Sequence, residues 1–203
     1  MKEKEISLQD YRLIEARSII DEFTVAIDSI TIQPSFSQSI ESLLNCKGKI
    51  ITSGIGKAGI IMSKFSSTLC SLTFPSCYLH PTEAQHGSLG VISSNDILFL
   101  ASTSGKTREC IELINLARKI NVQEIIGITS HLDSPIRDKV DIVIDMGIIQ
   151  EAGHLKLAPT TSTLVLLAIT DTLALVAAKE KGITNKDFHL RHHGGYLANI
   201  SKG

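Results

Sequence analysis

The 203-residue sequence lacks the features that mark several large classes of protein. Its formal net charge is −1, and it has no basic stripe that would suggest nucleic acid as a partner. The N-terminus is polar and lacks the apolar core of a signal peptide. The longest apolar stretch, Leu164 to Ala178, contains Asp171 and two threonines and looks too short and too polar to span a bilayer. These absences predict a cytoplasmic protein that acts away from membranes.

Paired cysteines are also lacking. The four cysteines, Cys46, Cys70, Cys77 and Cys110, form no C-x-x-C pair, so a cysteine zinc cluster is not expected. Without an export signal they are expected to be reduced thiols in the core. What remains is an ordinary globular composition, 43% apolar and 20% charged, with a length that fits one domain over residues 1–203.

Apolar periodicity separates N-terminal helices, over residues 1–46, from an α/β region over residues 47–203. Residues 8–30 carry apolar groups mostly three to five positions apart, which predicts an amphipathic helix, and a second helix runs from Pro34 to Cys46. Short β-branched runs then alternate with helical stretches. Strands are expected at Lys49–Ser53, Ser76–Leu79, Ile97–Ala101, Ile125–Thr129 and Asp141–Asp145, and helices at Ala58–Ser71, Thr107–Ile120, near Pro135 and at Thr160–Lys181.

This alternation of continuously apolar strands with helices predicts the fold class α/β. We expect a doubly wound, Rossmann-like sheet of five parallel strands with helices on both faces. Ligands in such folds bind beyond the carboxyl ends of the strands, so the loops at those ends are the places to search for chemistry.

The loop Ser53–Gly59 fits the pattern G-x-G-x-x-G, for which a dinucleotide fold is the obvious interpretation. Two observations count against it. The segment Ser76–His80 offers no acid for a ribose, and Lys57 sits inside the glycine turn, where it would point at the ligand. The glycines also fit a tight turn with no ligand at all, because such turns need glycine for backbone freedom alone.

The loop Ser102–Thr107 gathers four hydroxyl side chains and one glycine before a predicted helix. Free amides and the positive end of the helix dipole favour an anion there, and hydroxyls donate to phosphate oxygens. Simple N-capping would need only one serine or threonine. The density of hydroxyls therefore favours a phosphate site.

Three further segments hold acids and histidines. His80–Gly87 has two histidines and one acid, Gln150–Thr161 carries Glu151 after a strand, and His189–Gly195 has three histidines and an arginine. A zinc site on the last segment would lack a third obvious ligand.

Together, a phosphate cradle, two carboxylates, a lysine and histidines suit proton transfer between adjacent carbons of a sugar phosphate. The phosphate anchors the substrate, a histidine opens the sugar ring, and a glutamate removes the proton beside the carbonyl to give an enediolate. A lysine steadies the charge that develops on oxygen. This scheme requires no metal, nucleotide or other cofactor.

The same segments resemble the sugar isomerase (SIS) family and, within it, the D-arabinose 5-phosphate isomerases. The combination of HP-x-EA-x-HG-x-LG with LAPT is typical of this subgroup, and the similarity covers most of the chain beyond the first helix. The matching stretches are Ser53–Gly59, His80–Gly90 (HPTEAQHGSLG), Ser102–Glu109 (STSGKTRE), Glu151–Ser162 (EAGHLKLAPTTS) and Asp187–Gly195 (DFHLRHHGG).

The resemblance implies reversible conversion of D-ribulose 5-phosphate to D-arabinose 5-phosphate, which feeds synthesis of Kdo for lipopolysaccharide or capsule. It also implies a homotetramer with sites between subunits. The implied catalytic residues are Lys57, His86, Glu109, Glu151 and His192. The implied substrate-binding residues are Ser53, Gly54, His80, Ser102, Ser104, Thr107 and Thr160. His80 resembles a position that also takes an inhibitory zinc ion.

Within that group we expect Glu151 to be the carbon base, with Glu109 as the competitor. His192 is expected to open the ring with help from His86, and Lys57 to stabilise the enediolate or bind an oxygen. Lys106 stands where many relatives have an acid, and should add attraction for anions. Many relatives continue into paired CBS domains whereas this sequence stops, so regulation is expected within the domain, with feedback by a Kdo nucleotide as one hypothesis.

Three other interpretations stay open. One is an isomerase of another sugar phosphate, such as a hexulose or heptulose phosphate, on the same scaffold. A second is a sensor that binds a sugar phosphate without catalysis, and a third is a structural subunit whose histidines bind metal. A sensor would not need Glu109, Glu151 and His192 together.

Overall fold

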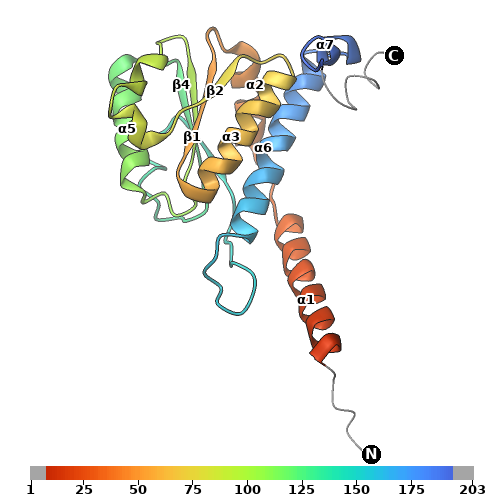
Figure 1. The fold of residues 1–203 in the computed structure, drawn as a ribbon. Coiled ribbons are helices and arrows are strands. Elements are labelled where there is room, and N and C mark those ends of the chain that lie inside the picture. Colours follow the sequence, from red (N-terminus) through yellow and green to blue (C-terminus); the bar gives the residue numbers. More distant parts are fainter. Residues whose placement is uncertain (1–7, 194–203) are drawn as a thin grey trace, which may run out of the picture.

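A computed structural model describes residues 8–193 of the chain. Its centre is a five-stranded, all-parallel sheet in the order β2-β1-β3-β4-β5, with helices on both sides (Figure 1). The strands are β1 (Ile50–Gly54), β2 (Ser76–Tyr78), β3 (Ile97–Ala101), β4 (Glu124–Thr129) and β5 (Ile142–Asp145). The helices are α1 (Leu8–Asp28), α2 (Pro34–Asn45), α3 (Gly56–Ser71), α4 (Pro81–Ala84), α5 (Arg108–Ile120), α6 (Thr161–Glu180) and α7 (Asn185–His189), with a 3-10 turn at Ser88–Val91. The predicted doubly wound α/β fold is confirmed.

The strands are buried on both faces, which is why their sequences are continuously apolar rather than alternating. Along β3, for example, Ile97 and Phe99 join a core with α2, α3 and α6, while Leu98 and Leu100 join a core with α4 and α5. This period of two is the pleat of the strand. The sheet therefore separates two hydrophobic layers.

Helix α5 illustrates how the sequence pattern specifies one buried face. Cys110, Leu113, Ile114 and Ala117 are buried at helical spacing, and the helix ends at Asn121, which adopts the left-handed conformation with φ 57°. Helix α6, in contrast, is apolar on almost all sides. By length and composition alone it could cross a membrane, but 56% of its apolar window is buried in the domain, as expected of a core helix.

Some local expectations were wrong. The segment near Pro135 forms successive turns instead of a helix, with the N–H of Arg137 donating to the carbonyl of Ser134. Helices α4 and α7 were not predicted, since four or five residues are too few to show a helical period. Gly194 and Gly195 of the last motif lie outside the described residues.

The cysteines also depart from expectation. All four are free, but only Cys110 is buried, and burial raises the pKa of its thiol to about 12. Cys46 and Cys77 are partly exposed, and Cys70 is exposed. Cys70 lies in the last turn of α3, outside the helix face that meets the sheet. The description as core thiols therefore holds for one of the four.

A buried carboxylate ties β1 to β3 at the amino edge of the sheet. Asp96 accepts hydrogen bonds from the backbone N–H of Lys49 at 2.9 Å, from Lys49 Nζ at 2.7 Å and from the backbone N–H of Ser93 at 2.7 Å. Burial acts to raise the pKa of Asp96, but the hydrogen bonds from Lys49 and Ser93 outweigh it and hold that pKa below its usual value.

The strand order places a crevice at the opposite, carboxyl edge. The chain leaves β1 into α3 on one face of the sheet, and leaves the adjacent β3 into α5 on the other face. The two loops diverge at this switch point, which is where ligands bind in open parallel sheets.

Candidate active site

A cavity of about 430 Å³ lies at this switch point. It is formed by the loops after β1, β3 and β4, the loop between β5 and α6, and the start of α6. The polar side chains that line it include Lys57, Ser102, Ser104, Thr107, His131 and Glu151. A second cavity of about 470 Å³ lies at the amino edge, but Glu41, Glu124 and Asp141 line it and would repel an anion.

The loop after β3 is shaped by its own hydroxyl groups. The Oγ of Ser102 lies 2.9 Å from the Oγ1 of Thr107 and accepts the N–H of Gly105 at 3.1 Å. Thr107 occupies the N-cap position of α5, yet its side chain makes no capping hydrogen bond. The amides of the first turn are therefore not consumed by a side-chain cap, and they add to the hydroxyls as donors for an anion.

Gly105 allows this loop to sit against the loop after β4. Its φ is +62°, and a Cβ atom there would lie 1.6 Å from the Oγ of Ser134. Lys106 also joins the two loops, since its Nζ lies 2.7 Å from Oδ2 of Asp133. This hydrogen bond lowers the pKa of Asp133, and the aspartate offsets the positive charge that Lys106 was expected to offer to anions.

The glycine loop after β1 brings Lys57 to the cavity. Helix α3 starts directly after the strand, and its approach is so close that a Cβ on Gly59 would lie 2.6 Å from the carbonyl oxygen of Gly54. Lys57 is exposed in the first turn of α3 and lines the cavity. The glycines therefore do make a tight turn, and the turn also presents a cation.

Glu151 is held by the N-terminus of α6. Its Oε2 accepts the backbone N–H groups of Thr160 at 2.8 Å and Ser162 at 3.2 Å. Its Oε1 has no hydrogen-bond partner among the described residues, and the side chain lines the cavity. One carboxylate oxygen thus fixes the orientation of the group while the other is left for a ligand.

Other predicted site residues lie near the carboxyl edge but do not line the cavity. Ser53 donates its hydroxyl to the carbonyl of Leu79 at 2.6 Å, and the carbonyl of Gly54 accepts the hydroxyl of Tyr78. Thr160 donates to Glu151 and so acts on that carboxylate. His80 caps α4 by accepting the N–H of Thr82 on Nδ1.

Three predicted catalytic residues are also absent from the lining of the cavity of the same chain. Glu109 is half-buried in the first turn of α5, and His86 is exposed after α4. His192 stacks on Phe188, and its Nε2 lies 3.3 Å from the Oγ of Ser71. Ser71 ends helix α3, whose first turn lines the cavity, so most of the length of this helix, roughly 20 Å at 1.5 Å per residue, separates the contact made by His192 from the cavity.

No group of three metal-ligating side chains occurs within residues 8–193. His80 has one ring nitrogen engaged by Thr82, which leaves Nε2 as its single atom for a metal. The zinc ion expected at His80 stays a prediction.

Sequence reasoning missed His131, which lines the cavity two residues after β4. Its position directly after a predicted strand could have indicated it, because the carboxyl end of β4 lies at the same edge of the sheet as the carboxyl ends of β1 and β3. A single histidine forms no motif, so the sequence of the loop after β4 carries no further signal.

The SIS domain model matches residues 43–176 of the chain. Among curated proteins, the chain is 37% identical to the arabinose 5-phosphate isomerase KdsD of Pseudomonas aeruginosa over 85% of its own length and 53% of the relative. It is 34% identical to KpsF of Escherichia coli, also named an arabinose 5-phosphate isomerase, over 94% of its length and 59% of the relative. The chain thus spans little more than half of these curated relatives.

Two solved structures correspond over their whole length. One is a Bacteroides fragilis protein, provisionally described as a phosphosugar isomerase involved in capsule formation, with 38% identity and a TM-score of 0.88 over 91% of this chain and 99% of that one. The other is an Escherichia coli CFT073 protein in complex with arabinose 5-phosphate, with 30% identity and a TM-score of 0.86 over 92% of this chain and 99% of that one.

Proposed function

Because the chain belongs to the SIS domain family, we propose that it is an aldose–ketose isomerase that interconverts D-ribulose 5-phosphate and D-arabinose 5-phosphate. One observation carries the proposal. A single cavity combines the hydroxyl-rich loop Ser102–Thr107, a lysine, and a carboxylate with one oxygen anchored and the other free. An anion site beside a fixed base is what proton transfer on a sugar phosphate requires.

The phosphate would bind at the loop after β3. Ser102, Ser104 and Thr107 offer hydroxyls, and the N-terminus of α5 offers amides and the positive end of its dipole. Binding there holds the substrate through atoms that do not react, so the binding energy orients the reacting carbons.

Glu151 would then remove the proton from carbon 1 of the ketose and return one to carbon 2, through a cis-enediolate. Its anchored Oε2 restricts the side chain, and its free Oε1 is the basic atom. Lys57, in the same cavity, would stabilise the negative charge on the enediolate oxygen. Glu109 remains the competing base, but it does not line the cavity of its own chain.

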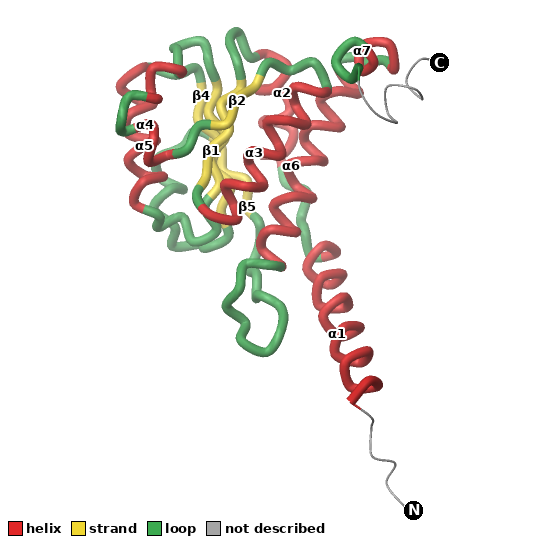
Figure 2. The backbone as a smooth tube through the Cα atoms, in the orientation of Figure 1, coloured by secondary structure: helices red, strands yellow, loops and turns green. Residues whose placement is uncertain are grey.

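Ring opening by His192 would require a second copy of the chain, because His192 contacts the far end of α3, roughly 20 Å along the helix from the cavity of its own chain. We therefore include a homotetramer with shared sites in the proposal. Exposed apolar side chains near the cavity are consistent with such contacts. Ile148, Leu155 and Leu157, each more than 60% exposed, lie on the loop between β5 and α6, which projects beyond the sheet (Figure 2).

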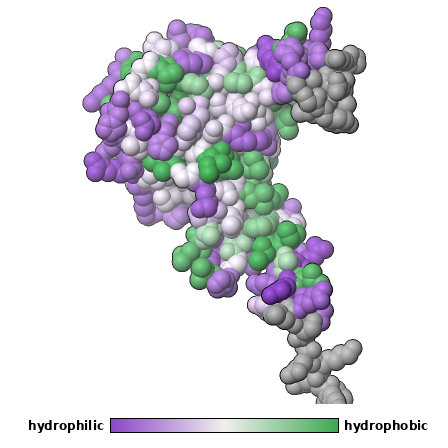
Figure 3. All heavy atoms as spheres, in the orientation of Figure 1, coloured by the Kyte–Doolittle hydropathy of each residue, from purple (hydrophilic) through white to green (hydrophobic). Residues whose placement is uncertain are grey.

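Figure 3 shows hydrophobic side chains gathered at this end of the molecule, over the projecting loop and the adjoining parts of α1 and α6.

Mixing two inactive variants tests whether one active site is shared between two chains. Chains with Glu151→Gln and chains with His192→Ala should regain activity when mixed and reassembled, because some sites then combine intact Glu151 with intact His192. No recovery in a mixed oligomer would mean that the two residues do not act in one shared site.

The role in Kdo synthesis for lipopolysaccharide or capsule, the cytoplasmic location and feedback by a Kdo nucleotide belong to the same proposal. They rest on the similarity to KdsD, KpsF and the Bacteroides fragilis protein. A competitive titration with the Kdo nucleotide tests the feedback, since inhibition should be overcome by added substrate.

The activity itself is tested by incubating the protein with D-ribulose 5-phosphate in deuterated water. We expect arabinose 5-phosphate that carries deuterium at carbon 2, observed by NMR. Hexulose and heptulose phosphates, run in parallel, test the substrate's chain length. Binding of all these sugars without exchange would refute the isomerase and favour a sensor.

A further inference from the structure

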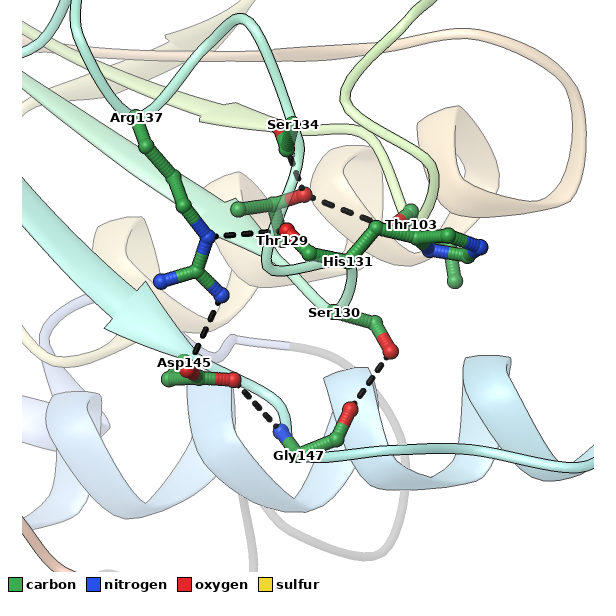
Figure 4. Close-up of polar contacts among 8 residues, drawn as sticks. All are labelled: Thr103, Thr129, Ser130, His131, Ser134, Arg137, Asp145 and Gly147. Atoms are coloured by element: carbon green, nitrogen blue, oxygen red, sulfur yellow. Dashed lines mark hydrogen bonds and ion pairs between the residues drawn. The ribbon is translucent and has the colours of Figure 1, made fainter.

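His131 lies on the wall of the cavity, outside every motif that suggested the function. It follows β4 and is exposed, and its ring lies beside Thr103 of the phosphate loop, which is the loop Ser102–Thr107 after β3 (Figure 4). The ring Nδ1 lies 3.1 Å from the carbonyl oxygen of Thr103. A carbonyl oxygen only accepts, so this contact assigns the hydrogen to Nδ1.

The backbone of this residue is held from two sides. The carbonyl oxygen of His131 accepts a hydrogen bond from Nε of Arg137 at 2.8 Å. The Nη2 of Arg137 in turn donates to Oδ2 of Asp145, at the end of β5, at 2.9 Å. The preceding Ser130 donates its N–H to the carbonyl of Thr103 at 3.0 Å and its hydroxyl to that of Gly147. Figure 4 shows these contacts converging on the end of β4. Because the backbone at His131 is already restrained, a bound ligand would cost little conformational entropy there, which favours binding.

The second ring nitrogen, Nε2, has no hydrogen-bond partner among residues 8–193. A protonated ring donates through Nε2 to an anion, and a neutral ring accepts there from a ligand hydroxyl. Thr103 and Ser104, on the same wall, belong to the loop that would hold phosphate. We infer that His131 is a further ligand-binding residue, with Nε2 in contact with the phosphate end of the bound sugar phosphate. The identity of the ligand rests on the proposed function.

A purely structural role is the alternative, in which His131 serves only to hold Thr103. Two substitutions separate the roles. In His131→Asn the side-chain amide takes the place of Nδ1–H and can still donate to Thr103, but the group equivalent to Nε2 is gone. In His131→Ala both are gone. His154→Asn makes the same chemical change at an exposed histidine that does not line the cavity.

The decisive measurement is calorimetric binding of inorganic phosphate at fixed pH and ionic strength. We expect His131→Asn to weaken phosphate binding on the order of tenfold, as for a lost hydrogen bond to a charged group. KM for arabinose 5-phosphate should rise by a similar factor with kcat within about twofold, while thermal unfolding matches the wild-type protein. His154→Asn should bind phosphate like the wild type.

Wild-type phosphate affinity in His131→Asn, whatever the effect of His131→Ala, would overturn the inference and leave the structural role. An equal loss in His154→Asn would do the same, because the effect would not be specific to the cavity. Because phosphate binding is measured without turnover, the role of His131 and the proposed isomerase activity can be refuted independently. A protein that binds phosphate through His131 but isomerises no pentose phosphate contradicts only the proposed function.

Discussion

Replacing Glu151 with glutamine would remove the proposed base while preserving the anchor that holds it. The glutamine oxygen can still accept the N–H groups of Thr160 and Ser162, now 2.8 and 3.2 Å from Oε2 of Glu151. The free Oε1 is then replaced by the amide NH2 group, which donates hydrogen bonds and does not accept a proton near neutral pH. The substitution therefore removes the basic atom and retains the hydrogen bonds that hold the side chain at the start of α6.

The expected effects on stability and on catalysis differ widely in size. Loss of a negative charge at the N-terminus of α6 costs about 0.3–1 kcal/mol of the free energy of unfolding. Loss of a positioned general base lowers the rate about 10²–10⁴-fold, which corresponds to roughly 2.7–5.4 kcal/mol of transition-state stabilisation. Phosphate affinity should be unchanged or slightly higher, because one nearby negative charge is gone.

Three measurements on the same preparation check this reasoning. Deuterium incorporation at carbon 2 reports the proton transfer, urea unfolding reports the free energy of unfolding, and calorimetry reports phosphate affinity. Glu109→Gln is the matched control, since it makes the same change on α5 outside the cavity lining. Exchange above about one tenth of the wild-type rate in Glu151→Gln, with near-complete loss in Glu109→Gln, would refute the assignment and make Glu109 the base.

Three further substitutions test the phosphate loop and the amino edge. Ser104→Ala should chiefly raise KM with kcat little changed, because Ser104 lines the cavity but makes no contact with the proposed base; an equal fall in kcat in steady-state kinetics would contradict a binding role. Gly105→Ala should weaken phosphate binding in calorimetry and lower the unfolding temperature, since its Cβ would clash at 1.6 Å. The control Gly182→Ala has φ +72° with no atom within 4 Å of the added Cβ, and should cost only the strain of the left-handed conformation, about 1–2 kcal/mol; equal losses in both would show that the clash is unimportant. Asp96→Asn should lower the free energy of unfolding in urea by about 1–3 kcal/mol, because the buried carboxylate accepts three hydrogen bonds. Because folding lowers the pKa of Asp96, its contribution to the free energy of unfolding is complete above the ordinary carboxyl pKa and is lost as pH falls through the lower folded value. The free energy of unfolding of Asp96→Asn should therefore fall less steeply with decreasing pH than that of the wild type. An equally steep fall in both proteins would show that the pair with Lys49 is dispensable.

The fold could be predicted because each strand is a local signal. Ile97–Ala101 is apolar throughout and appears in the structure with the same bounds, and Ile125–Thr129 differs from β4 by one residue. The order β2-β1-β3-β4-β5 has a different origin. It depends on contacts between strands far apart in the sequence, and a pattern of local propensity does not contain them.

The site was predictable only to the extent that it is built from loops with dense motifs. Lys57, the Ser102–Thr107 loop and Glu151 were found from sequence and line one cavity. The charge on Lys106 was misjudged because its partner, Asp133, is 27 residues away and joins it only when the loops after β3 and β4 meet. His131 could not be predicted for the same reason, since it becomes part of the site only through its contact with Thr103, 28 residues away.

The position of His192 limits what one chain can do. A histidine held at Ser71, at the far end of α3, cannot exchange a proton with a sugar bound beside Lys57, because proton transfer requires contact within about 3 Å or one bridging water. A single chain therefore brings together the proposed anion site and the proposed base but not this acid. If the chain opens sugar rings with His192, the group must come from another copy, and the rate per chain should fall with dilution below the dissociation constant of the oligomer. If ring opening persists in the isolated chain, another group of the same cavity must perform it, and His131 and Lys57 are candidates because both line the cavity.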